Sequence, residues 1–313
     1  METKNLSVGY SAKGKDNILF ENLNLSLQAG ELVCFMGPNG IGKSTLMRTL
    51  AGLQKPLSGT ISKVDEKNVA LVLTERVTVT NMTVKELVTF GRYPYLDWRV
   101  SLAEEDIQIV NNSIAQVHIQ HLTEKKITEL SDGQMQLVMI ARALAQNTSV
   151  LLLDEPTAHL DLNNRVEIMN LLRKLARETN KAILVATHEL DLALQTADLI
   201  WLATYGKKIK SGVPEDLVLT GAFDEVFQFK GFDLKTGKVN QEAHRGVKIK
   251  LVGDGHHYLW TKNALERCGF TVDANAAVII SVNANNKLAW ELDRKVHSNL
   301  SDLLKSLMIL THS

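Results

Sequence analysis

The stretch GPNGIGKST, residues 37 to 45, lies between the apolar run VCFM and the largely apolar run TLMRTLAGL. This order predicts a buried strand, a glycine-rich turn and a helix. The glycines Gly37, Gly40 and Gly42 let the backbone turn so that successive N–H groups point at one anion, and the helix adds the positive end of its dipole. Lys43 can reach the β- and γ-phosphates of a nucleotide, and the Ser44 hydroxyl can bind Mg²⁺. The alternative is a chance match in a surface loop, and the flanking strand and helix argue against it.

A second candidate segment is VLLLDEPT, residues 150 to 157. A hydrophobic strand that ends in Asp154 and Glu155 places both carboxylates at the carboxyl edge of a sheet, beside the phosphate loop. Asp154 can then hold the Mg²⁺ shell, and Glu155 can orient and polarise a water for attack on the γ-phosphate. Without the phosphate loop, such a pair usually marks only a solvated strand end.

The segment LSDGQ, residues 130 to 134, opens the apolar helix QMQLVMIARALA. Ser131 stands three residues before Gln134, which is the spacing of a helix capping box. Taken alone, this pattern favours a simple N-cap.

Length, net charge and cysteine content limit the possible functions further. The chain has 313 residues, with 35 Lys plus Arg against 35 Asp plus Glu, so no net charge favours bulk attraction to nucleic acid or anionic lipid. Cys34 and Cys268 stand far apart, which fits a reducing compartment. The N-terminus lacks the apolar core of a signal peptide, and no run approaches the roughly 20 apolar residues that span a bilayer.

Strand-like and helix-like runs alternate along the chain, which predicts an α/β domain with a largely parallel sheet. A helical insert is expected over about residues 82–148. It contains two S/T-x-x-E patterns typical of capping boxes, Thr83 with Glu86 and Ser101 with Glu104. We place a domain boundary near residue 245, so that residues 1–245 form the large domain and residues 246–313 a small α+β domain with the order βαββα.

Five motifs occur in the order GPNGIGKST, LSDGQ, LLLDEPT, HLD and ATHE. Together they resemble the nucleotide-binding subunit of an ABC transporter, over about residues 1 to 245. FGRYPYL, LSDGQMQLVMIARALAQ and DEPTAHLDL are most similar to the importer branch that serves iron–siderophore complexes, haem and cobalamin. The resemblance implies a P-loop ABC-type domain that binds ATP and Mg²⁺.

The resemblance also implies roles for single residues. The phosphate loop that binds ATP would comprise Gly37, Pro38, Asn39, Gly40, Ile41, Gly42, Lys43, Ser44 and Thr45. Asp154 would be the metal-shell carboxylate and Glu155 the catalytic base. His188 would be the switch histidine that reaches the γ-phosphate. Tyr10 stands where the family stacks a ring on adenine; the alternative is an ordinary strand tyrosine.

Three further positions imply a head-to-tail dimer with two ATP molecules at its interface. Ser131 and Gly133 would contact the γ-phosphate of ATP held by the other subunit, and Asp161 belongs to the loop that couples the two sites. A second subunit would supply donors to the γ-phosphate and exclude water, which strengthens stabilisation of the transferring phosphoryl group.

Two positions depart from the family pattern. The family places a glutamine after the strand that reads VALVL here, to touch Mg²⁺ and the attacking water, whereas this chain has Thr74 and Glu75. Either side chain could bind the metal, and both possibilities stay open. Asp132 stands where glycine is commoner, and its carboxylate is expected to point away from the phosphate.

The segment after residue 245 has no counterpart in this resemblance. GDGHH lacks the third glycine of a dinucleotide turn. A metal-sensing site is one possibility, because His244, His256, His257, His297 and His312 lie at or after the boundary, but solvated or capping histidines fit better without a fixed ligand spacing. We expect a regulatory or dimer-stabilising role.

Together these features predict an ATPase on the cytoplasmic face of the cell membrane. It would dock on a transmembrane permease, act indirectly with a periplasmic or surface substrate-binding protein, and power uptake of a chelated metal. The insert should carry the docking surface, with Tyr93, Tyr95 and Trp98 near it; ordinary packing of these rings is the alternative. The other hypotheses are an importer of another substrate, such as a free metal ion, and a soluble ABC ATPase acting on DNA or the ribosome. The single cassette and the lack of a basic stripe argue against the latter, so no nucleic-acid partner is expected.

Overall fold

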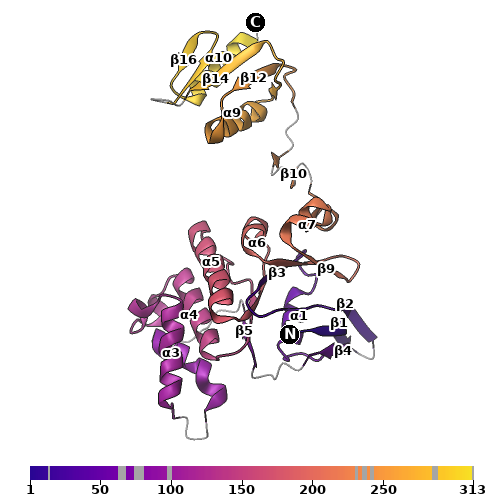
Figure 1. The fold of residues 1–313 in the computed structure, drawn as a ribbon, viewed down its shortest axis with the longest axis vertical. Helices are drawn as coiled ribbons and strands as arrows, with labels where there is room; N and C mark the ends of the chain where they lie inside the picture. The colour runs from indigo at the N-terminus through magenta and orange to yellow at the C-terminus, as the bar shows by residue number, and fades with distance from the viewer. Residues whose placement is uncertain are drawn as a thin grey trace. The chain divides into compact units, whose positions relative to one another are not determined.

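The computed structural model describes residues 1–12, 15–62, 68–73, 81–96, 101–229, 232–234, 238–239, 243–283 and 288–311. The chain forms two compact units, Met1–Gln228 and Phe229–Ser313, which Figure 1 draws as ribbons. Each unit has its own hydrophobic core. The domain boundary near residue 245 stays a prediction.

The larger unit is built on a six-stranded sheet with the strand order β5-β6-β7-β3-β8-β9. Neighbouring strands pair in parallel except for β9, which runs antiparallel to β8. All residues of β3, β6 and β7 are buried, because a parallel strand covered on both faces needs a continuous apolar run. The predicted α/β fold is confirmed. The strands are β3 (Leu32–Met36), β5 (Val69–Val72), β6 (Val150–Asp154), β7 (Ala182–Ala186), β8 (Leu199–Ala203) and β9 (Ile209–Gly212).

A three-stranded antiparallel sheet, ordered β2-β1-β4, shares this core. Its strands are β1 (Thr3–Ala12), β2 (Lys15–Leu23) and β4 (Ser58–Ile61). The ring of Phe35 in β3 links the two sheets, since its centroid lies 6.1 Å from that of Phe20 in β2 and 6.5 Å from that of Trp201 in β8. Helix α1 (Lys43–Leu50) adds Leu46 and Met47 to the same cluster, which fixes the helix behind the phosphate loop.

The part of the chain between β5 and β6 is helical where the structure describes it (Figure 1). Thr83 caps the first helix through the predicted box: its hydroxyl accepts from the N–H of Glu86, and Glu86 accepts from the N–H of Thr83 at 2.7 Å. The elements are α2 (Val84–Thr89), η2 (Phe90–Tyr95), α3 (Glu104–Gln116), η3 (Gln120–Leu122), η4 (Ile127–Glu129) and α4 (Asp132–Ala145).

The second expected capping box is wrong. Helix α3 begins at Glu104, its N-cap residue is Ala103, and the N–H of Ala103 donates to the Asp106 carboxylate at 3.0 Å. A carboxylate at the third helical position satisfies this N–H by itself, so the start of the helix needs no hydroxyl from Ser101.

Four helices complete the larger unit: α5 (Leu162–Thr179), α6 (Leu190–Thr196), α7 (Pro214–Leu219) and α8 (Ala222–Phe227). Over the described ranges, no helix combines the length and the apolar character that crossing a membrane requires.

The smaller unit contains a five-stranded sheet ordered β13-β12-β14-β15-β16. Ile249, Ile280 and Leu292 of the sheet share one core with both helices of the unit. Because side chains alternate along a strand, Ile279 and Glu291 point to the opposite face. The elements are β12 (Lys248–Val252), α9 (Gly255–Arg267), β13 (Thr271–Val272), β14 (Val278–Asn283), β15 (Ala289–Leu292), β16 (Lys295–His297) and α10 (Leu300–Thr311), preceded by the pair β10 (Phe232–Asp233) and β11 (Lys238–Val239).

The reactivity of the two cysteine thiols can test the burial of strand β3. Burial raises the pKa of the Cys34 thiol in β3 to about 12, whereas Cys268 is partly exposed. Since the thiolate is the reactive form, we expect a thiol reagent at mildly alkaline pH to modify Cys268 rapidly and Cys34 only after unfolding. Titration of reactive thiols with and without guanidinium chloride measures this. Rapid loss of both thiols in the native protein would contradict the buried position of β3.

Candidate functional site

The phosphate loop runs from the end of β3 to the start of α1. Gly40 and Gly42 have φ angles of 75° and 110°, a region that side chains with a Cβ rarely adopt. A Cβ on Gly42 would also lie 2.8 Å from Leu19 Cδ1, so the loop packs tightly on β2 at this point. The sequence GPNGIGKST thus forms the strand–turn–helix that it predicts.

Lys43 folds back into this loop. Its Nζ donates hydrogen bonds to the carbonyl oxygens of Gly37, at 2.9 Å, and Pro38, at 3.3 Å. Burial lowers the pKa of Lys43, while the negative charges of Glu155 and Asp154 oppose this shift. A positive charge is therefore held at the centre of the loop.

Asp154 and Glu155 lie at the carboxyl end of β6. Ala186 of β7 pairs with Asp154 on one side and with Phe35 of β3 on the other, so β6 and β3 end at the same level of the sheet. Asp154 is buried, and burial raises its pKa, whereas a hydrogen bond with Ser44 opposes the shift. This bond joins the two residues expected to hold Mg²⁺, and a carboxylate beside a hydroxyl suits a hard cation.

Glu155 and His188 lie side by side. Glu155 adopts a left-handed backbone conformation with φ of 50°, which turns its side chain out of the strand direction. His188 follows β7, the strand between β6 and β3. Its Nδ1 lies 3.7 Å from Glu155 Oε1 and its Nε2 lies 3.5 Å from Glu189 Oε1.

Arg165 in the first turn of α5 connects this histidine to the HLD motif. Its Nη1 donates to Glu189 Oε1 at 2.6 Å, and its Nε donates to the Leu160 carbonyl at 2.6 Å. Sequence analysis missed both Arg165 and Glu189, because the two residues stand 24 positions apart and no local pattern connects them.

Asp161 is the N-cap residue of α5. Its carboxylate accepts from the backbone N–H and the side-chain amide of Asn164, at 2.9 and 3.0 Å. The same Asn164 packs against Gly133, where a Cβ would lie 3.0 Å from Asn164 Cγ. Asn164, which sequence analysis did not single out, therefore links the LSDGQ and HLD motifs within one chain.

Ser131 caps helix α4. Its hydroxyl accepts from the N–H of Gln134 at 3.3 Å, and the Gln134 side chain accepts from the N–H of Ser131 at 3.2 Å. Within the part of the chain that the structure describes, no hydrogen bond or ion pair links Ser131 or Gly133 to the phosphate loop. A role of these residues at a phosphate held by a second subunit stays a proposal.

Tyr10 lies beside the phosphate loop. Its side chain is half exposed, and its hydroxyl shares a 2.5 Å hydrogen bond with Thr45 Oγ1. The ring is thus tied to α1 while part of it remains open to a ligand.

Other expected residues lie outside the described ranges or away from this site. Thr74, Glu75, Trp98 and His312 fall outside the described residues. Tyr93 packs against Phe90 in a tilted arrangement with 4.2 Å between ring centroids, and Arg92 lies over the ring of Tyr95.

The histidines of the C-terminal unit do not form a metal site within the described residues. The rings of His256 and His257 are adjacent in α9, and His297 is buried in β16. Across the described part of the chain, no group of three His, Cys, Asp or Glu side chains gathers to hold a metal.

The chain is similar to several known proteins. A family model described as ABC transporter matches residues 20–158, and one described as iron ABC transporter C-terminal domain matches residues 246–308. An uncharacterized ABC transporter ATP-binding protein of Methanocaldococcus jannaschii is 42% identical over 241 residues, 74% of this chain and 82% of the relative. The achromobactin transport ATP-binding protein CbrD of Dickeya dadantii is 35% identical over 236 residues, 72% of this chain and 86% of the relative.

Solved structures of ABC transporters and of their cassettes also resemble this chain. A transporter described as of the metal-chelate type, in an inward-facing conformation, matches with a TM-score of 0.66 and 28% identity over 72% of this chain and 88% of that chain. A dimeric bacterial ABC transporter cassette matches with a TM-score of 0.57 and 27% identity over 68% of this chain and 98% of that chain. This chain therefore belongs to the ATP-binding subunits of ABC transporters, which hydrolyse ATP to drive transport.

Proposed function

We propose that this ATPase powers uptake of a ferric siderophore through a transmembrane permease, to which it is bound at the cytoplasmic face of the membrane. The observation that carries the proposal is the C-terminal match to an iron ABC transporter domain, in the same chain as a cassette 35% identical to an achromobactin transport protein. Haem or cobalamin uptake is the alternative within this branch.

The phosphate loop and the strand-end carboxylates divide the chemistry between them. Lys43 and the loop N–H groups neutralise the phosphates of ATP, while Glu155 orients a water and accepts its proton. Ser44 and Asp154 would hold Mg²⁺, which neutralises charge on the phosphates when bound. His188, beside Glu155, would contact the γ-phosphate.

The working unit is proposed to be a dimer. Ser131, Gly133 and Asp161 lie at the starts of α4 and α5, which Asn164 links, and among the described residues they make no hydrogen bond to the chain's own phosphate loop. Placing them on the ATP of a second copy would exclude water from the γ-phosphate, and the dimeric cassette among the similar structures supports such an arrangement.

The helical insert is the proposed docking surface for the permease. Tyr93 and Tyr95 are 46% and 38% exposed although each also packs on a neighbour, so packing leaves part of each ring open for a partner. Partly exposed tyrosines are typical of interface residues.

Uptake of ⁵⁵Fe-labelled siderophore tests this function in a host that lacks the chain. Restored uptake with the wild-type chain, and none with Glu155→Gln, is expected. If the wild-type chain restores uptake only of labelled cobalamin, haem or a free metal ion, the ferric siderophore assignment is wrong. If the host takes up every substrate without this chain, the chain has no role in import.

Glu155→Gln keeps the size of the side chain but removes the proton acceptor. We expect ATP hydrolysis to fall by at least about a hundredfold, the usual contribution of a general base. ATP binding should persist, and gel filtration with ATP should show a dimer. A variant that hydrolyses ATP at the wild-type rate would exclude Glu155 as the base.

Tyr10→Ala and Tyr10→Phe separate stacking from the hydrogen bond to Thr45. Loss of a stacked base costs about 1–3 kcal/mol, so Tyr10→Ala should weaken ATP binding about tenfold or more. Tyr10→Phe should bind ATP nearly as well as the wild type. Fluorescence titration with a labelled ATP analogue measures both affinities. Equal affinities for all three proteins would identify Tyr10 as an ordinary strand residue.

Arg165→Ala removes the link between the HLD motif and the switch histidine. Because hydrogen bonds to charged groups contribute about 1.5–3 kcal/mol, we expect kcat to fall about tenfold while ATP affinity is unchanged. Arg165→Lys should restore part of the rate, since it can still pair with Glu189. Arg177→Ala, on the same helix and paired with Asp198, is the matched control and should behave as wild type. An unchanged kcat in Arg165→Ala would show that the pair has no positioning role.

A further inference from the structure

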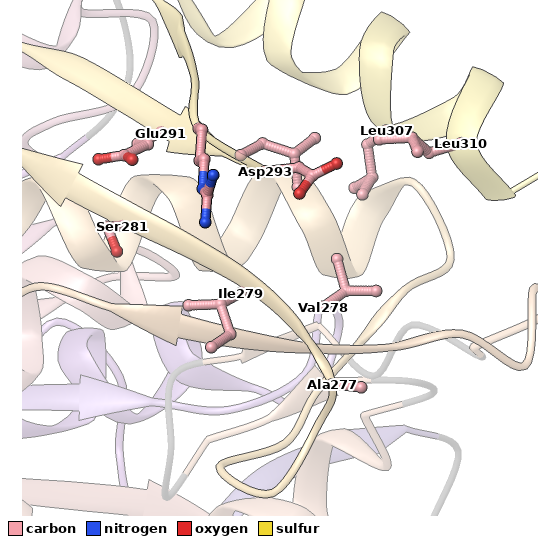
Figure 2. A pocket seen from close by; sticks show the side chains of 10 residues that line it. Ala277, Val278, Ile279, Ser281, Glu291, Asp293, Leu307 and Leu310 are labelled. Atoms are coloured by element: carbon pink, nitrogen blue, oxygen red, sulfur yellow. The ribbon is translucent and has the colours of Figure 1, made fainter.

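The C-terminal unit contains a cavity of about 480 Å³ that the ATPase site does not use. It lies where β14 begins, where β15 ends and where α10 completes its last turns, as Figure 2 shows. The volume falls within the range of small-molecule sites. The lining lies entirely within residues 277–310, so it includes no residue of the ATPase site.

One part of the lining is apolar. Val278 and Ile279 come from β14, and Leu307 and Leu310 come from α10. Ile279 and Leu310 are 48% and 53% exposed, which leaves hydrophobic surface uncovered at this point. Covering such surface with an apolar group removes it from water, which favours binding.

The other part of the lining is charged. Glu291, Asp293 and Arg294 face the cavity, together with the hydroxyl-bearing Ser281. Within the described residues, none of the three charged side chains forms an ion pair or a side-chain hydrogen bond with another residue. Their hydrogen-bonding capacity is therefore available to a ligand.

Two of these charged residues lie in a tight turn of the backbone. Asp293 and Arg294 form the two-residue turn between β15 and β16, with φ angles of 48° and 64°. Such turns favour Asn, Asp or Gly, and an arginine in the left-handed region is unfavourable. Arg294 therefore occupies a turn position at which Asn, Asp or Gly would be more stable.

The charges limit what the cavity can bind. An apolar ligand would remove water from three charges and leave them unpaired, which is costly. A simple anion would meet two carboxylates, and a simple cation would meet the guanidinium. A molecule with both charges and an apolar body satisfies every part of the lining.

We propose that this cavity binds a small zwitterion with apolar side chains, of the size of an apolar dipeptide. Its carboxylate pairs with the Arg294 guanidinium, for which two parallel hydrogen bonds are the favoured geometry. Its ammonium group pairs with Glu291 and Asp293. Its side chains cover the exposed surface of Ile279 and Leu310.

Isothermal titration calorimetry of the full chain with leucyl-phenylalanine tests this proposal. Saturable binding is expected for the wild type. Arg294→Asn removes the guanidinium but suits the turn, so binding should weaken about tenfold or more without a lower melting temperature. Glu291→Gln with Asp293→Asn should weaken binding to a similar extent. Lys295→Gln, next to the turn but outside the lining, is the matched control and should bind as wild type.

Two ligand controls complete the design. The same dipeptide with an acetylated amine and an amidated carboxylate lacks both charges and should bind at least about tenfold more weakly. Saturating ATP should not displace leucyl-phenylalanine. The proposal is overturned by absence of saturable binding, by equal affinities for wild type and Arg294→Asn, by equal affinity for the capped dipeptide, or by competition with ATP.

Discussion

A buried ammonium group at the turn between β3 and α1 is the constraint on which the larger unit depends. Lys43 is 7% exposed, and a charge so far from water needs partners. The carbonyls of Gly37 and Pro38 supply two of them, and the carboxylates of Asp154 and Glu155 supply the compensating charge. The loop is thereby held in its curved shape before any phosphate arrives, so that binding needs little reorganisation.

The strand order explains how residues more than 100 positions apart meet there. Strand β7 lies between β3 and β6, and Ala186 pairs with a residue near the end of each neighbour. Three strands that end at one level place the phosphate loop, the carboxylates and His188 at a single edge of the sheet. Ligand sites of open α/β sheets lie at this edge, because the carboxyl ends of parallel strands meet there.

Local patterns were sufficient to predict the fold and the motifs at this edge. Continuous apolar runs such as VLLLD are typical of buried strands of a parallel sheet, and GPNGIGKST has the glycines and the flanking residues of a phosphate-binding turn. The side chains that connect these motifs, in contrast, belong to no recognisable sequence pattern. Arg165 and Asn164 resemble any polar residues on an exposed helix turn until the structure places Glu189 and Gly133 against them. The start of α3 was misplaced because a carboxylate at Asp106 performs the capping that Ser101 was expected to perform.

The charged cavity of the C-terminal unit was missed for a related reason. Asp293 and Arg294 look like solvated turn residues in the sequence, and Glu291 follows the alternation of an ordinary half-buried strand. Only the approach of α10 from the end of the chain turns these positions into a lining. Cavities are formed by tertiary packing, which the period of a single strand does not encode.

The first turn of α5 joins the two sides of the ATPase site. Asn164 and Arg165 are consecutive residues, yet Asn164 packs on Gly133 of the LSDGQ motif and Arg165 binds Glu189 beside His188. Both also hold the HLD loop, through Asp161 and the Leu160 carbonyl. A displacement of that loop must therefore change both contacts together. In a head-to-tail dimer, the first turn of α5 would link the LSDGQ motif, which would contact the nucleotide of the partner, with His188, which would contact the nucleotide of the same chain. This link needs no longer chain of contacts through the core.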